Sequence, residues 1–202
     1  MSTSIRRDAR LNREHILAAA LRALTANPEA SMDEVAQAAG LSRRTIYGHF
    51  ANREALLEAL VAVAADDVAT VADAIDFSEG DPVVLLARFT AAAWQLRERY
   101  EALTTFANLG PARVAMKRRL GGIRSRIAVL VERGQASGAF ADDIPPLVLS
   151  HMLGSLMLGA IESVADGAID AAEGEHAIVI ATLRTAGVPR ARALRALEQA
   201  TN

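Results

Sequence analysis

The chain has 202 residues, of which 51% are apolar and 23% charged, and its formal net charge is −2. This length suggests one or two domains and allows a sizeable core. The absence of cysteine excludes disulfide bonds, thiolate metal sites and cysteine nucleophiles, and it fits a reducing cytoplasm. No signal-peptide-like apolar region follows the N-terminal arginines, and no apolar run reaches the ~18 residues of a membrane span. We therefore expect a cytoplasmic protein with no membrane partner.

The amino-acid composition favours helices. Alanine accounts for 43 residues, whereas aromatic residues make up only 4% of the chain. Since alanine is the best intrinsic helix former and β-branched alternation is scarce, the composition predicts an all-α fold.

Charge is unevenly spread along the chain. Residues 1–13 carry a net charge of +3, residues 14–60 of −2 and residues 61–202 of −3. The weakly acidic total, which disfavours nucleic acid as a partner, therefore conceals a basic N-terminal arm.

The first predicted helix spans 8–26 and ends at Asn27-Pro28, because proline disfavours helix in the residue before it. The sequence Ser31-Met32-Asp33-Glu34 is a capping box, in which serine and glutamate each satisfy a free backbone donor. It predicts a second helix at 32–39.

A tight turn and two further helices follow. Gly40 suits the left-handed residue of such a turn. Ser42 can cap a third helix at 43–49, and Asn52 can cap a fourth at 53–75.

The rest of the chain is a series of predicted helices separated by glycine and proline. They span residues 82–108, 111–120, 123–136, 146–166, 172–186 and 190–200. One of these separations, between 120 and 123, rests on the pair Gly121-Gly122.

The second and third helices, joined by a glycine turn, are typical of a helix-turn-helix. Val35, Ala36, Leu41 and Ile46 supply its apolar positions. The third helix is short, basic and rich in hydrogen-bond donors, as a helix that enters the major groove must be.

The stretch from Arg13 to Leu57 resembles the TetR family of bacterial transcriptional regulators. The residues that carry the resemblance are Ile16-Leu17-x-x-Ala20, Val35-Ala36-x-x-Ala39-Gly40-Leu41-Ser42, Thr45-Ile46-Tyr47-x-His49-Phe50 and Arg53-Glu54-x-Leu56-Leu57. The resemblance implies an N-terminal helix-turn-helix DNA-binding domain at 1–57, with a basic arm at 1–13. It also implies a helical ligand-binding and dimerisation domain at 58–202.

The resemblance implies contacts with double-stranded DNA. The residues implied are Ser42, Arg43, Arg44, Thr45, Tyr47, His49 and Arg53. Arg43, Arg44 and Thr45 match positions that face base edges or nearby phosphates, and the guanidinium fork can bond O6 and N7 of guanine together. Tyr47, His49 and Arg53 match positions that contact the DNA backbone, although Tyr47 could instead cover the core and His49 could be a surface histidine.

Two positions depart from the family pattern, and the basic arm has two interpretations. Met32 stands where the family usually has threonine, and Gly48 replaces a residue that is often bulky. Arg6, Arg7 and Arg10 could attract phosphates or form a solvated tail.

The C-terminal part is expected to bind an unknown small molecule that is largely apolar. Trp94, Thr105, Asn108 and His151 are the predicted ligand contacts, because they add polar groups to a region rich in aromatic residues and methionine. Core packing is the alternative for each of them. The basic cluster Lys117, Arg118, Arg119, Arg124 and Arg126 is either a solvated face or attracts an anionic ligand.

The helices at 146–166 and 172–186 are the most apolar pair. The resemblance implies that they form the interface of a homodimer, which would bind a palindromic operator. The predicted interface residues are Leu149, Met152, Leu153, Leu156, Ile178 and Leu183. The alternative is that this apolar stripe packs only within the chain.

Two other classes of function remain as alternatives. An enzyme is disfavoured, because Glu173-x-x-His176 lacks the second pair that a di-iron bundle needs, and neither phosphate-binding loops nor a nucleophile elbow occur. The other is a helical protein-interaction module that has lost DNA binding. We therefore expect a ligand-responsive regulator, a repressor in the simplest case, with no catalytic site, cofactor or metal ion.

Overall fold

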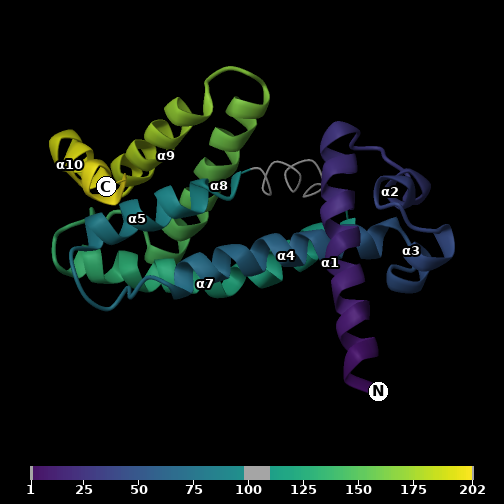
Figure 1. The fold of residues 1–202 in the computed structure, drawn as a ribbon. Coiled ribbons are helices and arrows are strands. Elements are labelled where there is room, and N and C mark those ends of the chain that lie inside the picture. Colours follow the sequence, from purple (N-terminus) through teal and green to yellow (C-terminus); the bar gives the residue numbers. More distant parts are fainter. Residues whose placement is uncertain (1, 98–109, 202) are drawn as a thin grey trace. The chain divides into compact units, whose positions relative to one another are not determined.

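The computed structural model describes the backbone of residues 2–97 and 110–201 and the side chains of residues 11–97 and 118–200. Every regular element in that part of the chain is a helix, so the predicted all-α fold is confirmed (Figure 1). The elements are α1 (Ser2–Ala26), α2 (Met32–Ala38), α3 (Arg43–His49), α4 (Arg53–Asp73), α5 (Pro82–Trp94), α7 (Gly110–Ala136), α8 (Pro146–Ala165), α9 (Ala171–Thr185) and α10 (Arg190–Thr201).

The described residues fall into two compact units that meet within α4. Of the described residues, the first unit includes those up to Ala64 and residues 110–116 at the start of α7, and the second includes residues 65–97 and 117–201. The helix α4 therefore contributes its first half to one unit and its second half to the other.

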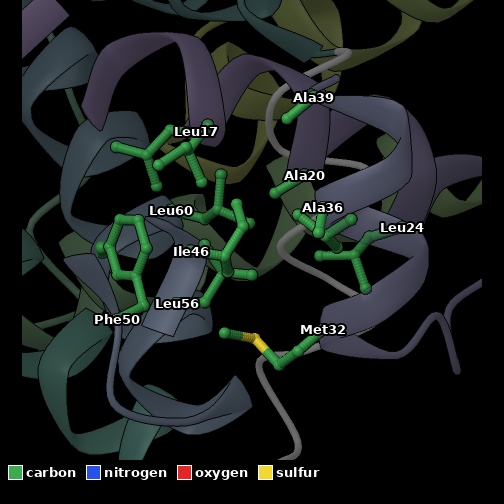
Figure 2. Packing of buried hydrophobic residues seen from close by; sticks show 14 of the residues in the cluster. Leu17, Ala20, Leu24, Met32, Ala36, Ala39, Ile46, Phe50, Leu56 and Leu60 are labelled. Atoms are coloured by element: carbon green, nitrogen blue, oxygen red, sulfur yellow. The ribbon is translucent and has the colours of Figure 1, made fainter. Parts of the chain in front are cut away.

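The core of the first unit joins α1, α2, α3 and the start of α4. Ile46, the fully buried residue of α3, points into a cluster that includes Leu17, Leu56 and Leu60 (Figure 2). Since a buried Leu or Ile side chain contributes about 1.5–3 kcal/mol relative to an exposed one, this cluster fixes α3 on its partners.

The predicted capping residues and glycine turn of this unit are confirmed, whereas the first helix begins at Ser2 and not at residue 8 as predicted. The Ser31 hydroxyl accepts the Glu34 N–H at 3.3 Å, and the Ser31 N–H donates to the Glu34 carboxylate at 2.7 Å, which completes the capping box. Gly40 has φ +64°, in the left-handed region. Ser42 caps α3, and the side chain of Asn52 accepts the Ala55 N–H at 2.8 Å at the start of α4.

The core of the second unit brings α5 against α9 and α10, and α8 against α9. Trp94, at the end of α5, is buried and donates its indole N–H to the Ala171 carbonyl at 3.1 Å. Its ring lies so close to Gly174 of α9 that a Cβ there would come within 2.5 Å. Glycine at this position thus permits the close packing of α5 and α9.

The predicted helix break at Gly121-Gly122 is wrong, because α7 is continuous from Gly110 to Ala136. Ile123, Ile127 and Leu130 of this helix are buried. Their burial outweighs the cost of about 1 kcal/mol that each glycine imposes on a helix.

Arginines of α7 at intervals of seven residues bind the second half of α4 and the loop after it. Arg119 pairs with Asp66 at 2.7 Å, and Arg126 pairs with Asp73 and donates to the Ala72 carbonyl at 2.7 Å. Arg133 donates to the carbonyls of Ser78 and Gly80 at 3.1 and 2.9 Å. The second unit thereby holds the end of α4 against α7.

Candidate functional site

The third helix presents a polar and basic surface opposite its buried residue. Ile46 points into the core, whereas Arg43, Arg44 and Tyr47 are exposed, and the Tyr47 side chain is 49% exposed despite its size. An exposed aromatic residue beside two arginines suits a surface that meets a polyanion.

The hydroxyl groups of Ser42 and Thr45 form hydrogen bonds at the start of α3. Ser42 Oγ accepts the Thr45 N–H at 3.2 Å and lies 2.9 Å from Thr45 Oγ1. Capping of this kind stabilises a helix by about 1 kcal/mol. Both residues therefore order the helix end from which Arg43 and Arg44 project.

Arg43 is paired within the chain. Its Nε donates to Oδ1 of Asp33 in α2, and its Nη2 faces Oδ2 of the same carboxylate. The pair joins the first turn of α2 to the first turn of α3. Sequence reasoning did not identify Asp33, because an exposed carboxylate ten residues from its partner leaves no local pattern.

Arg53 is half-buried at the start of α4. Its Nε donates to the Ala30 carbonyl at 3.2 Å, and its Nη2 donates to the Pro28 carbonyl. These carbonyls belong to the loop that precedes α2. The guanidinium group therefore ties α4 to the beginning of α2.

The remaining residues of the predicted DNA interface lie around α3. His49 is half-buried beside Phe50, and the guanidinium of Arg13 lies 4.7 Å from the Phe50 ring centre. From Ser2 onward, the backbone of the basic arm is helical as part of α1. The side chains of Arg6, Arg7 and Arg10 lie outside the described ones.

The two departures from the family pattern have different surroundings. Met32 is buried in the core of the first unit, so its thioether side chain fills space between helices. Gly48 faces open space, since a Cβ built there would have no neighbour within 4 Å. Met32 thus has a packing role in the core. At Gly48, no side chain projects from the outer surface of α3.

A carboxylate near this surface has a perturbed pKa. The N–H and hydroxyl of Ser31 donate to Glu34 and hold the pKa of its carboxyl below the ordinary value of 4.5. Above pH 4.5, Glu34 is therefore charged and the capping box is intact.

A second candidate site is the outer face of α8 and α9. A hollow of about 590 Å³ lies between these helices. Its lining includes Met152, Leu156 and Gly159 of α8 and Ile178 and Ala181 of α9. The large apolar side chains of Leu147, Val148, Met152 and Leu158 on α8 are exposed.

The predicted dimer residues divide between this hollow and the core. Met152, Leu156 and Ile178 line the hollow, although Ile178 is itself buried. Leu149, Leu153 and Leu183 are buried within their own chain. Sequence periodicity could not separate the two groups, because α8 is apolar on several faces.

The helix α8 is also long and apolar enough to span a membrane, with a mean hydropathy of 1.5. This finding corrects our expectation that no stretch of the chain meets this criterion; Glu162 is its one acidic residue and it has no Lys or Arg. Only 22% of the window is buried inside the chain. Core helices of soluble proteins pass the same test, so length and composition alone do not establish a span.

Of the predicted ligand residues, Trp94 and His151 are described. Trp94 is buried with its N–H already bonded, whereas His151 is exposed on α8. Thr105 and Asn108 lie outside the described residues. The structure thus does not assemble these residues into one pocket within the part of the chain it describes.

Two arginines of the basic cluster of α7 are engaged in ion pairs. Arg119 and Arg126 form ion pairs with α4, and burial lowers the pKa of Arg124. The Lys117 side chain lies outside the described ones, and Arg118 is exposed. Among the described residues, no group of three or more His, Asp or Glu side chains could hold a metal ion.

Comparison with known proteins identifies both the N-terminal domain and the fold. Residues 16–60 match the family model of bacterial regulatory proteins of the tetR family. No curated protein matches the sequence.

Several solved structures resemble the chain over most of their length. A TetR-family transcriptional regulator from a Rhodococcus species has a TM-score of 0.72 at 18% identity, over 87% of this chain and 98% of that one. The regulator FadR from Bacillus subtilis, solved with stearoyl-CoA, has a TM-score of 0.72 at 15% identity, over 85% and 98%. RolR, solved with resorcinol, has a TM-score of 0.63 at 21% identity, over 95% of each chain.

Proposed function

Because residues 16–60 belong to the TetR family of bacterial regulatory proteins, we propose that the chain is a ligand-responsive transcriptional repressor. A homodimer binds a palindromic operator and releases it when a small molecule binds. The observation that carries this proposal is the exposed basic surface of α3, anchored on the core by Ile46. Residues 1–57 form the DNA-binding domain, residues 58–202 form the ligand-binding and dimerisation domain, and the protein acts in the cytoplasm.

The DNA interface combines base contacts with backbone contacts. Arg43 and Arg44 face base edges in the major groove, where a guanidinium fork can bond O6 and N7 of guanine together. Tyr47 and His49 contact phosphates, which set register but carry no sequence information. Ser42 and Thr45 support both groups by ordering the start of α3.

The homodimer forms through the outer face of α8 and α9. This face combines exposed apolar side chains with a hollow of about 590 Å³ that a second copy could fill. Gly159 and Ala160 permit close approach of helices along it. A two-fold dimer presents two copies of α3 to successive major grooves, which is the geometry that a palindromic operator requires.

Release of the operator requires a ligand that distinguishes two conformations of the dimer. A ligand with equal affinity for both would shift neither population. The effector proposed is small and largely apolar; RolR was solved with resorcinol, a small aromatic compound, and FadR with stearoyl-CoA, which has an apolar acyl chain. The helix α4, which belongs to both units, is the element through which the ligand acts.

The experiment that tests this function is selection of bound sequences from a random DNA pool by the full-length chain. A palindromic consensus with half-sites about 10 base pairs apart is expected for a dimeric helix-turn-helix. No enrichment would contradict the proposal and favour a helical protein-interaction module. Release of the selected DNA by individual metabolites would then test the response to a ligand.

A further inference from the structure

We propose that Asp33 is a specificity-determining residue of the DNA interface. Its carboxylate holds the side chain of Arg43 so that the outer end of the guanidinium group is presented to a base edge. This inference rests on the proposed function, since it concerns how the same surface distinguishes one DNA sequence from another.

Asp33 binds some of the N–H donors of Arg43, and the donors that a base needs are not used by this pair. A guanidinium group has five N–H donors. Asp33 binds the side of the fork, through Nε and Nη2. One donor on Nη2 and both on Nη1 are not used by this pair, and the outer pair, one from each Nη, matches O6 and N7 of guanine.

Both partners project from ordered helix ends. Asp33 lies in the first turn of α2, two residues after Ser31, whose capping box with Glu34 fixes that end. Arg43 is the first residue of α3, directly after the capping residue Ser42. The side chain of Arg43 is thus held at both ends, at its backbone and at its guanidinium.

The pair contributes to orientation more than to folding. The side chains of Arg43 and Asp33 are 72% and 41% exposed. Exposed ion pairs contribute only about 0–1 kcal/mol to stability. Loss of the Asp33 charge therefore leaves the domain folded but frees the Arg43 side chain to contact any nearby phosphate.

The negative charge of Asp33 also favours specific over non-specific DNA binding. Phosphate contacts supply most of the affinity for unrelated DNA. A carboxylate beside the contacting arginine repels phosphates whatever the base sequence, whereas the orientation that it imposes favours one base pair. Both effects increase the ratio of specific to non-specific binding.

The test compares Asp33→Asn with the control Glu29→Gln, which removes one negative charge from an exposed residue in the loop before α2. Affinities are measured for the selected operator and for operators changed at the base pair whose preference is lost in Arg43→Ala. We expect Asp33→Asn to lower the discrimination at that base pair roughly threefold to tenfold, a part of what a bidentate contact provides. Glu29→Gln should raise all affinities equally.

Two further variants assign the effect to the pair. In the Arg43→Ala background, Asp33→Asn should have no additional effect on discrimination. Asp33→Glu, which keeps the charge, should retain part of the discrimination that Asp33→Asn loses. Thermal melts of each variant report folding separately. Unchanged discrimination in Asp33→Asn, or an unchanged base preference in Arg43→Ala, would overturn the inference but not the proposed function. Failure of the unaltered chain to select any sequence would overturn both.

Discussion

At the scale of single residues, Arg53 links two parts of the DNA-binding domain. Its guanidinium donates to the carbonyls of Ala30 and Pro28, in the loop that leads into α2. A lysine has one compact ammonium group and cannot reproduce the planar fork. The structural and electrostatic roles of Arg53 can therefore be separated by comparing alanine with lysine.

We expect Arg53→Ala to lower the free energy of unfolding by about 1–2 kcal/mol, because it removes charged donors from the carbonyls of Ala30 and Pro28, the first of these hydrogen bonds being half-buried. It should also weaken binding to all DNA sequences. Arg53→Lys should lose a similar amount of stability yet keep the dependence of affinity on salt. Urea denaturation and a salt series on one DNA duplex measure the two effects. An Arg53→Ala variant as stable as the unaltered chain would contradict the structural role.

The capping box at Ser31 gives the DNA-binding domain a dependence on pH. The folded pKa of Glu34 lies below its ordinary value of 4.5. The charged carboxylate therefore stabilises the fold above pH 4.5, and this contribution is lost as the pH falls through the lowered pKa. Glu34→Gln removes the charge at every pH.

We expect Glu34→Gln to be less stable than the unaltered chain at pH 7 and the difference to shrink as the pH falls below 4.5. Urea denaturation across this range measures it. Glu29→Gln, which removes an equal charge from the adjacent loop, is the control. A difference that stays constant from pH 7 to pH 3 would show that the charge of Glu34 does not act through the capping box.

At the scale of helices, local sequence predicts the N-terminal unit better than α7. The capping box at Ser31, the left-handed Gly40 and the cap at Ser42 each depend on residues within a few positions of each other. The local sequence is therefore enough to predict them. The continuity of α7 depends on burial of Ile123 and Ile127 in the fold, which no local pattern reports.

The same distinction applies to the candidate site. The composition and spacing of α3 predict an exposed basic helix, and the structure has one. The pairing of Arg43 with Asp33 and the attachment of Arg53 to the loop before α2 require two elements to meet in space. Predicting such contacts requires knowledge of how the helices pack.

The glycine pair in α7 leads to a test at this scale. Gly122 is exposed, and a Cβ there would have no neighbour within 4 Å. Since glycine in a helix costs about 0.5–1 kcal/mol relative to alanine, we expect Gly122→Ala to raise the free energy of unfolding by that amount. Thermal or urea denaturation measures the change. A loss of stability would indicate that the folded chain needs a bend at Gly122.

Gly174→Ala is the control for this prediction, because it should have the opposite effect on stability. The ring of Trp94 occupies the space that a Cβ at Gly174 would need, with 2.5 Å between them. This substitution should destabilise the second unit, because the indole cannot move without losing its hydrogen bond to Ala171. The pair of variants separates helix propensity from packing.

At the scale of the whole molecule, α8 carries four of the eight large apolar side chains that are exposed in the described chain. Only 22% of its apolar window is buried. Exposed apolar side chains gathered on one helix in this way are typical of an interaction site. A second copy of the chain covers it in the proposed dimer.

We expect Met152→Glu to convert the dimer into monomers, because two charged groups per dimer would be buried without partners. Met152 is 41% exposed and lines the hollow between α8 and α9. Operator affinity should fall with dimerisation, since one copy contacts only one half-site. Sedimentation velocity and binding to full and half operators measure the two consequences.

Val129→Glu provides the matched control for this substitution. Val129 lies on α7, outside the hollow, and is 60% exposed. A glutamate at this apolar surface position would therefore remain in contact with water. This variant should remain dimeric and bind the operator normally. A dimeric Met152→Glu, or a monomeric Val129→Glu with an intact fold, would place the interface elsewhere. Loss of dimerisation only in Met152→Glu, with unchanged binding to a half operator, would assign the α8 and α9 face to assembly and the α3 surface to DNA.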